Sequence, residues 1–212
     1  MKIAIPRSVL IAFAFHFPFP AIGQDPPHTA EEKESRKSAS ANSPATSSRA
    51  TDIYRKGLHY FEEQQFSQAA GEYQKAADLG NPNAQHDLGL LYLDGRGVER
   101  NDQAALQLFR EAANQDYTQA LISLGVLYAT GRAVEKDEKE AVRLYLRAAE
   151  RGDPQAQSNL GLMYFHGNGI DQSIETAVSW FLKAANQGFT QAQYNLGVMH
   201  ERGRGVEQDK RE

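Results

Sequence analysis

The residues that most resemble a chemical site are two glycines around an arginine, Gly95-Arg96-Gly97. A dinucleotide-binding glycine loop needs a strand before it, a helix opening directly after it and an acidic residue about 20 positions on. Here a helical pattern precedes the loop, several residues separate it from the next helix, and the lysine and hydroxyl residue of a P-loop are missing. We interpret the motif as a corner between two helices, with Arg96 solvated, and predict no cofactor.

Other residue types that carry chemistry are sparse. His86, His166 and His200 occur in helical segments, but no two are four residues apart and there is no His-Glu-x-x-His sequence, so we predict no metal site. The chain has no cysteine, no Ser-x-x-Lys sequence and no serine with a base encoded nearby. The sequence therefore predicts no catalytic residues and a protein that is not an enzyme.

Net charge limits the partners. The 212 residues carry a formal net charge of −4, and no Lys- and Arg-rich cluster provides the basic surface that phosphate backbones require. We expect no nucleic-acid partner.

The first 50 residues differ in composition from the rest. Residues 1–23 combine Lys2 and Arg7, a short apolar run and small residues at Ala21 and Gly23, which is typical of a secretory signal peptide cleaved after Gly23. The apolar run is shorter than the roughly 20 residues that span a bilayer, so we expect no stable membrane anchor after cleavage. Residues 24–51 are nearly devoid of large apolar side chains and are predicted to be a disordered linker. Together these segments predict a periplasmic or secreted protein, the former favoured by the absence of cysteine.

The remaining residues repeat with a period of 36. The pair Leu88-Gly89 returns at Leu124, Leu160 and Leu196, and the glycine corner returns at Gly131, Gly167 and Gly203. Within each unit, apolar residues recur at helical spacing in a first segment (helix A) and again in a second (helix B). Helix B is preceded by the cap-forming residue types Asn101, Asp137, Ser173 and Asp209. A mid-helix glycine costs about 1 kcal/mol, so Gly89 and its equivalents indicate close helix packing.

The units are predicted at residues 52–81, 82–117, 118–153, 154–189 and 190–212, the last incomplete. The first is four residues shorter in the loop between its helices and lacks the glycine corner. In the other units we expect the first corner glycine to adopt a left-handed backbone. Because Ala133 occupies the second glycine position in one unit, we expect that position to have ordinary, negative φ.

The motif AQSNLGLMYFHGNGI, followed by FLKAANQG, resembles the SEL-one-like repeat family, and the shorter first unit is similar to its relative, the tetratricopeptide repeat. This resemblance implies an all-α, right-handed α/α solenoid that serves as a scaffold for binding other proteins. Cysteine-rich relatives have been linked to β-lactam binding, but the cysteines of those relatives are missing here.

The resemblance implies a partner groove along the concave face of the A helices. Carried over by the Leu-Gly pair, it selects positions three before the glycine and one, four and five after it, and the expected groove residues are His86, Leu90, Leu93, Ile122, Val126, Phe165, His166 and Tyr194. Leu90 and Val126 are equally compatible with packing against the neighbouring A helix.

The predicted function is that of an exported, non-catalytic scaffold or adaptor that binds a protein or peptide of unknown identity. A weak hydrolase or β-lactam-binding protein is the enzymatic alternative. The other alternative function is that of a self-assembling structural element. The last A helix is expected to leave Ala192, Leu196 and Met199 uncovered and so available for self-association.

Overall fold

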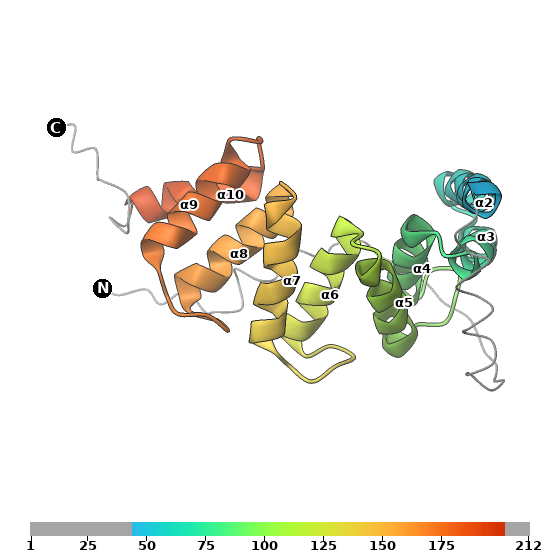
Figure 1. Ribbon diagram of the computed structural model, residues 1–212, viewed down its shortest axis with the longest axis horizontal. Helices are drawn as coiled ribbons and strands as arrows, with labels where there is room; N and C mark the ends of the chain where they lie inside the picture. Colours follow the sequence, from blue (N-terminus) through green and yellow to red (C-terminus); the bar gives the residue numbers. More distant parts are fainter. Residues whose placement is uncertain (1–43, 202–212) are drawn as a thin grey trace.

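A computed structural model describes residues 44–201, and this part of the chain is built of helices without a β-strand. Predictions for residues 1–43 and 202–212, including the signal peptide and the corner at Gly203, lie outside the described residues. The helices stack side by side along the long axis of the molecule, with α2 and α3 at one end and α9 and α10 at the other (Figure 1). Their bounds are α2 Pro44–Glu62, α3 Phe66–Asp78, α4 Pro82–Asp94, α5 Asp102–Asn114, α6 Thr118–Thr130, α7 Glu138–Glu150, α8 Pro154–His166, α9 Ile174–Ala185 and α10 Thr190–Glu201.

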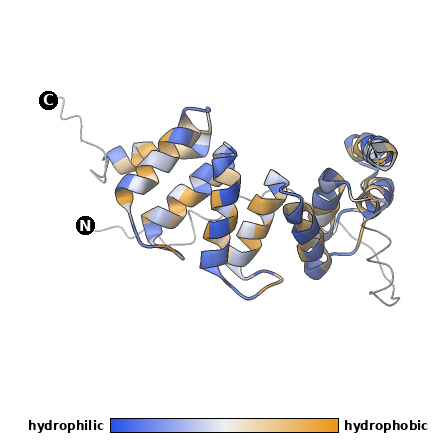
Figure 2. Ribbon diagram, viewed as in Figure 1, coloured by the Kyte–Doolittle hydropathy of each residue, from blue (hydrophilic) through white to orange (hydrophobic). Residues whose placement is uncertain are grey.

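Even-numbered helices are the A helices of the sequence pattern, and odd-numbered helices are the B helices. Each A helix packs against the B helix that follows it, and that B helix packs against the A helix of the next unit, which confirms an all-α solenoid of stacked helix pairs. Hydrophilic and hydrophobic residues are mixed along the helices (Figure 2). The B helices α5 and α7 have one buried and one exposed side, whereas the A helix α6 is buried on all sides from Ala120 to Leu127.

The linker prediction is wrong for its last eight residues, 44–51. Helix α2 begins at Pro44, and Ala50 is buried with 2% of its surface exposed. The linker prediction rested on the scarcity of large apolar residues, but a small alanine is sufficient where the helix packs closely.

The predicted helix starts are confirmed. Side-chain oxygens of Asn101, Asp137 and Ser173 accept hydrogen bonds from backbone N–H groups in the first turns of α5, α7 and α9. Asn81 and Asp153 cap α4 and α8 in the same way, each followed by proline at the first helical position.

The mid-helix glycines mark the closest approach within each pair. An added Cβ at Gly89 would lie 2.6 Å from the Phe109 ring, and one at Gly125 would lie 2.6 Å from the Tyr145 ring. Gly57 faces Tyr73 and Gly161 faces Phe181 in the same manner. The predicted close packing is therefore confirmed: a B-helix aromatic ring occupies the space that a Cβ would need. At Gly197 of α10, no described atom lies within 4 Å of an added Cβ.

The corner after each A helix has a fixed shape. Gly95, Gly131 and Gly167 cap their helices in the left-handed conformation, as predicted. The prediction for the second corner position is wrong, because Gly97, Ala133 and Gly169 have φ of 76°, 62° and 66°.

The reason lies in how the corner closes. The N–H groups of Asn101, Asp137 and Ser173 return to the carbonyls of Tyr92, Tyr128 and Tyr164 over 2.8–3.0 Å, which fixes the path of the loop in every unit. Ala133 follows that path although a left-handed alanine costs about 1–2 kcal/mol.

The first unit lacks this corner. Only residues 63–65 connect α2 to α3, whereas residues 95–101 connect α4 to α5. The four missing residues therefore fall in this loop, as predicted.

The expectation for the last A helix is largely wrong. Ala192 and Met199 are buried, with 0% and 3% of their surfaces exposed, because they pack on α9. Leu196 is half-buried. The exposed side of α10 carries Tyr194 and Gly197 instead.

Candidate functional site on the even-numbered helices

The A helices contact one another through two positions, three and two residues before the helix glycine, which we call the −3 and −2 positions. The Tyr54 hydroxyl at −3 of α2 donates to Asp87 Oδ2 at −2 of α4 over 2.8 Å. His86 Nε2 at −3 of α4 lies 3.1 Å from Ser123 Oγ at −2 of α6. We call each such −3/−2 pair between successive A helices a rung.

The first two rungs form one continuous network. His86 Nδ1 lies 3.0 Å from Asp87 Oδ1, so hydrogen bonds run from Tyr54 through Asp87 and His86 to Ser123 and connect three successive units. His86 and Ser123 are 8% and 9% exposed. The imidazole also packs 5.5 Å, centroid to centroid, from the rings of Phe109 and Tyr117. Burial and the neighbouring Asp87 carboxylate raise the pKa of Tyr54, which keeps its hydroxyl protonated as a donor.

Ser123, His86 and Asp87 follow the hydrogen-bonding order of a serine nucleophile, its base and the acid that orients the base. No sequence motif reveals this arrangement, because Ser123 is 37 residues from His86. Acyl transfer also needs free N–H donors about 3 Å from the developing oxyanion. Ser123 lies in the middle of α6, where backbone N–H groups are bonded within the helix. The backbone of α6 therefore offers no free donor beside Ser123, and the hydrogen bonds of His86 to Asp87 and Ser123 form a buried clamp between units.

The third and fourth rungs are different. At the third rung the equivalent positions hold Ile122 and Asn159, and an isoleucine side chain offers an amide no hydrogen bond. At the fourth they hold Ser158 and Asn195. Among the described residues, Ser158 Oγ and the amide nitrogens of Asn159 and Asn195 are buried without a hydrogen-bond partner.

Half of the predicted groove residues are buried and do not line an open surface. Leu93, Ile122 and Val126 are core residues, with 2%, 3% and 7% of their surfaces exposed. His86 belongs to the hydrogen-bond network described above. The prediction that these four line an open groove is wrong, because Leu93, Ile122 and Val126 pack in the core and His86 bonds to the neighbouring A helix. The partly exposed members are Leu90, Phe165, His166 and Tyr194.

A partly exposed band nevertheless follows the A helices. Two positions of each A helix contribute to this band. One is the residue directly after the helix glycine, which is half-buried except at Val126, and the other is the residue six before that glycine. We call the half-buried part of this band the open strip, comprising Asn83, Leu90, Gln155, Leu162, Gln191 and Val198. The −2 residues lie between these two positions along each helix. The strip is polar at one edge and apolar at the other.

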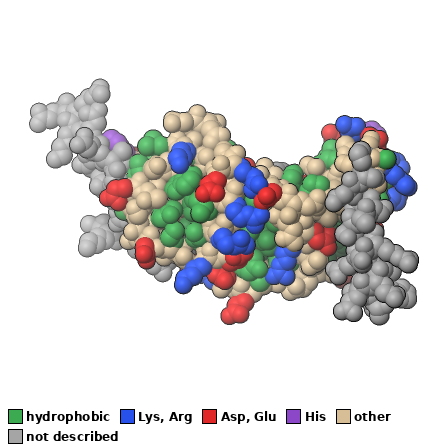
Figure 3. All heavy atoms as spheres, in the orientation of Figure 1, with side chains coloured by type: hydrophobic (Ala, Val, Ile, Leu, Met, Phe, Trp, Pro, Cys, Tyr) green, Lys and Arg blue, Asp and Glu red, His purple; other side chains and the backbone are tan. Residues whose placement is uncertain are grey.

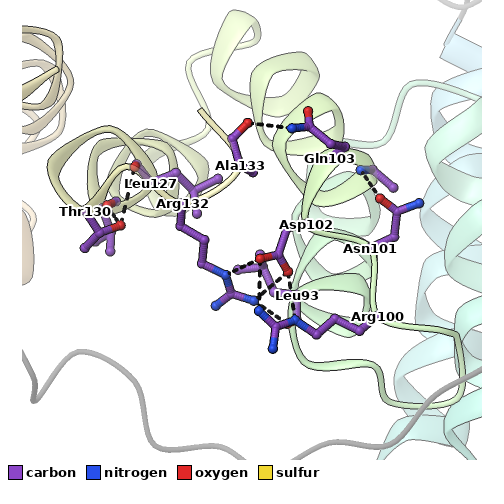
Figure 4. Close-up of polar contacts among 11 residues, drawn as sticks. Leu93, Arg100, Asn101, Asp102, Gln103, Leu127, Thr130, Arg132 and Ala133 are labelled. Carbon is purple, nitrogen blue, oxygen red and sulfur yellow. Dashed lines mark hydrogen bonds and ion pairs between the residues drawn. The ribbon is translucent and has the colours of Figure 1, made fainter. Parts of the chain in front are cut away.

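The corner arginines join units and do not face an empty site. Arg132 pairs with Asp102 at the start of the preceding B helix, Nε to Oδ2 over 2.7 Å and a second nitrogen to Oδ1 over 2.8 Å, and it also donates to the Leu93 carbonyl (Figure 4). Arg96 lies over the rings of Phe66 and Phe61, 4.4 and 5.4 Å from their centroids. The prediction of a solvated Arg96 is therefore wrong. Both arginines contact the preceding unit, which agrees with the prediction that the motif is a structural corner.

We expect Arg132→Ala to lower the free energy of unfolding by about 1–2 kcal/mol at pH 7, since it removes a charged, two-bond pair. Hydrogen bonds from Arg132 hold the pKa of Asp102 well below its usual range. This contribution is present above the unfolded carboxyl pKa of about 4 and is lost as the pH falls through that value toward the lower folded pKa. Urea unfolding of both proteins from pH 7 to pH 3 should show the difference shrinking below pH 4. Lys136→Ala, which removes an exposed pair with Glu138, is the control. An Arg132 effect no larger than the Lys136 effect would contradict the assignment.

Over residues 44–201 there is no group of three or more histidine, aspartate or glutamate side chains placed to hold a metal ion. In the same range, no helix combines the length and hydrophobicity needed to cross a bilayer.

Comparison with protein families gives a match over the whole repeat region. The profile described as Sel1 repeat matches residues 52–81, 82–117, 118–153, 154–189 and 190–212. The comparison with curated proteins found no significant match.

The chain is similar to a number of solved structures, among them the following three. A Sel1 repeat protein from Oxalobacter formigenes is 38% identical with a TM-score of 0.70, covering 76% of this chain and 67% of that one. The protein c5321, a protective antigen of uropathogenic Escherichia coli strains with an SLR fold, is 32% identical with a TM-score of 0.71. That match covers 86% of this chain but only 38% of c5321. The immunity protein Pa5087 from Pseudomonas aeruginosa is 25% identical with a TM-score of 0.53, over 72% of this chain and 59% of that one.

The five matched segments, the aromatic rings packed on the helix glycines and the likeness to two solved repeat proteins lead to one conclusion: this chain belongs to the Sel1 repeat family.

Proposed function

We propose that this Sel1 repeat protein is an exported, non-catalytic scaffold that binds a protein or peptide along the open strip of its A helices. The proposal is carried by a contrast between the residues that pack the helices together, which we call the frame, and the residues of the open strip. The helix glycines and the aromatic rings against them recur from unit to unit, whereas the strip residues change, from Asn83 to Gln155 at its polar edge and from Leu90 to Val198 at its apolar edge. A constant frame with a varied, partly exposed lining suits recognition of one extended ligand across several units.

Two further observations support binding over catalysis. The Ser123 hydroxyl is buried in the middle of a helix, away from free backbone N–H donors. The related antigen c5321 and the immunity protein Pa5087 are described by roles that name no reaction. Export is proposed from residues 1–23 alone, and N-terminal sequencing of the protein from a periplasmic fraction would test cleavage after Gly23.

The binding proposal is tested by selecting peptides from a random library displayed on phage and measuring their affinity by fluorescence anisotropy. Leu162→Arg places a charge on the open strip and should weaken a selected peptide at least tenfold. Leu182→Arg is the matched control, because Leu182 is exposed (46%) on the B helix α9. Circular dichroism establishes that both variants fold. The proposal fails if no peptide is enriched over a bare support, or if Leu182→Arg weakens binding and Leu162→Arg does not.

A further inference from the structure

The helix glycine of α10 differs from its equivalents in what covers it. In α2, α4, α6 and α8, a Cβ added to the helix glycine would lie 2.5–2.7 Å from an aromatic ring of the B helix that follows. At Gly197 of α10, an added Cβ would have no atom of the described residues within 4 Å, and the glycine is exposed. Residues 202–212, which follow α10, include no aromatic residue. None of them can supply a ring of this kind.

Tyr194 lies on the same side of α10 as this glycine. Its side chain is 63% exposed and is the most exposed large hydrophobic side chain of the described residues. Residues three apart in an α-helix are neighbours on one face. The exposed residues of α10 have this spacing and form one stripe, which consists of Thr190, Gln193, Tyr194, Gly197, His200 and Glu201. An exposed ring and an open helix glycine therefore lie next to each other on this stripe.

The residues around Tyr194 are similar to those around the rings that cover the other helix glycines. Each of those rings is followed, three residues later, by a fully buried alanine; the pairs are Tyr73 and Ala76, Phe109 and Ala112, Tyr145 and Ala148, and Phe181 and Ala184. A small residue at this position lets the helix that carries the ring approach its neighbour closely. Tyr194 is followed by Gly197 at the same spacing. The exposed stripe of α10 thus combines a ring suited to cover a glycine with a glycine suited to accept a ring.

We propose that two copies of this chain associate through α10, each placing its Tyr194 ring over Gly197 of the other copy. Across a twofold axis every contact occurs twice, so one pair of residues forms both halves of the interface. Two α10 helices related by such an axis run antiparallel, and the axis passes midway between positions 194 and 197. This inference goes beyond the proposed peptide binding, which needs only one copy.

Charge does not oppose this contact. Helix α10 contains no lysine or arginine, and Glu201 is its last residue, so the two Glu201 side chains of an antiparallel pair lie at opposite ends. Lysine and arginine side chains gather instead near the middle of the stack, around α7 (Figure 3). A contact made by one helix from each copy is small, so we expect a dimer that dissociates on dilution.

Sedimentation velocity over a series of protein concentrations tests the proposal. The wild type should shift from monomer to dimer and no further. Gly197→Ala adds a methyl group that meets nothing in the monomer, but the ring of the other copy would overlap it, so dimerisation should weaken by at least about tenfold. Gly71→Ala is the matched control, because Gly71 is also an exposed helical glycine with no described atom within 4 Å of an added Cβ. It should dimerise as the wild type does.

Variants of the ring test the other half of the contact. Tyr194→Phe should retain the dimer, because both tyrosine and phenylalanine rings cover helix glycines in this protein. Tyr194→Ala should weaken it by at least about tenfold, since aromatic residues dominate the binding energy of small interfaces. Circular dichroism establishes that each variant folds. A wild type that stays monomeric at every concentration would overturn the inference, as would equal dimerisation by Gly197→Ala or growth into assemblies larger than a dimer.

Discussion

Replacing Gly97 with alanine is expected to lower the free energy of unfolding by about 3 kcal/mol or more, which combines the cost of a left-handed alanine with that of overpacking. A Cβ at this position would overlap the backbone of Phe66 and Ser67 at the start of α3, with the Phe66 oxygen only 2.5 Å away. Backbone atoms cannot rotate aside as a side chain can. The substitution therefore either separates the second unit from the first or distorts the corner.

Ala133→Gly is the matched experiment in the opposite direction. Ala133 has φ of 62° at the equivalent position, and its carbonyl accepts a hydrogen bond from Gln103 over 2.8 Å, so the loop tolerates its Cβ. Glycine there should be neutral or stabilise by up to about 1 kcal/mol, since relief of the left-handed strain is partly offset by greater freedom of the unfolded chain. Urea unfolding followed by circular dichroism measures both variants. A Gly97→Ala protein as stable as the wild type would show that the corner is not held against α3.

The second large effect is expected at His86. His86→Ala should destabilise the protein by about 3 kcal/mol, because it leaves a cavity beside Phe109 and Tyr117 and removes one hydrogen-bond partner from each of Asp87 and Ser123. Ser123→Ala should cost less, about 1–2 kcal/mol, because it leaves a single imidazole nitrogen unsatisfied.

His59→Ala controls for loss of a histidine, since His59 is exposed on α2, and it should change stability by less than about 0.5 kcal/mol. Ser158→Ala controls for loss of a buried serine. Because Ser158 Oγ has no partner among the described residues, this variant should be neutral or more stable. Thermal unfolding of the four variants tests the set. If Ser123→Ala and Ser158→Ala behaved alike, the hydrogen bond from Ser123 would contribute nothing to the clamp.

Most of the frame could be predicted from the sequence because its signals are local. A cap residue such as Asn101 acts on the turn that follows it, and a mid-helix glycine such as Gly125 has one common reason to be present, close packing. The 36-residue period then extended each assignment to every unit. These features depend on short stretches of chain, which a single sequence displays directly.

The candidate site was less predictable because it depends on which residues face a neighbouring helix. The expected groove was placed at the −3 position, where Ile122 is buried, and the −2 position was overlooked. A signal was present, since the −2 residues of four units, Asp87, Ser123, Asn159 and Asn195, are all polar. Arg96 was misassigned for a similar reason: its aromatic partners come from the preceding unit, beyond the reach of a motif.

The arginine side chains of one unit contact the unit that precedes it in the sequence, and this direction bears on how the molecule assembles. Arg132 reaches Asp102, 30 residues earlier, and Arg147 reaches Asp116, 31 residues earlier. No such contact joins the two ends of the array over the described residues, so chain closure is always local and folding should be fast. Each finished unit presents the surface on which the next one docks. A chain delivered amino-terminus first, from a ribosome or through a membrane pore, can therefore fold progressively as it emerges, before its last residues have arrived.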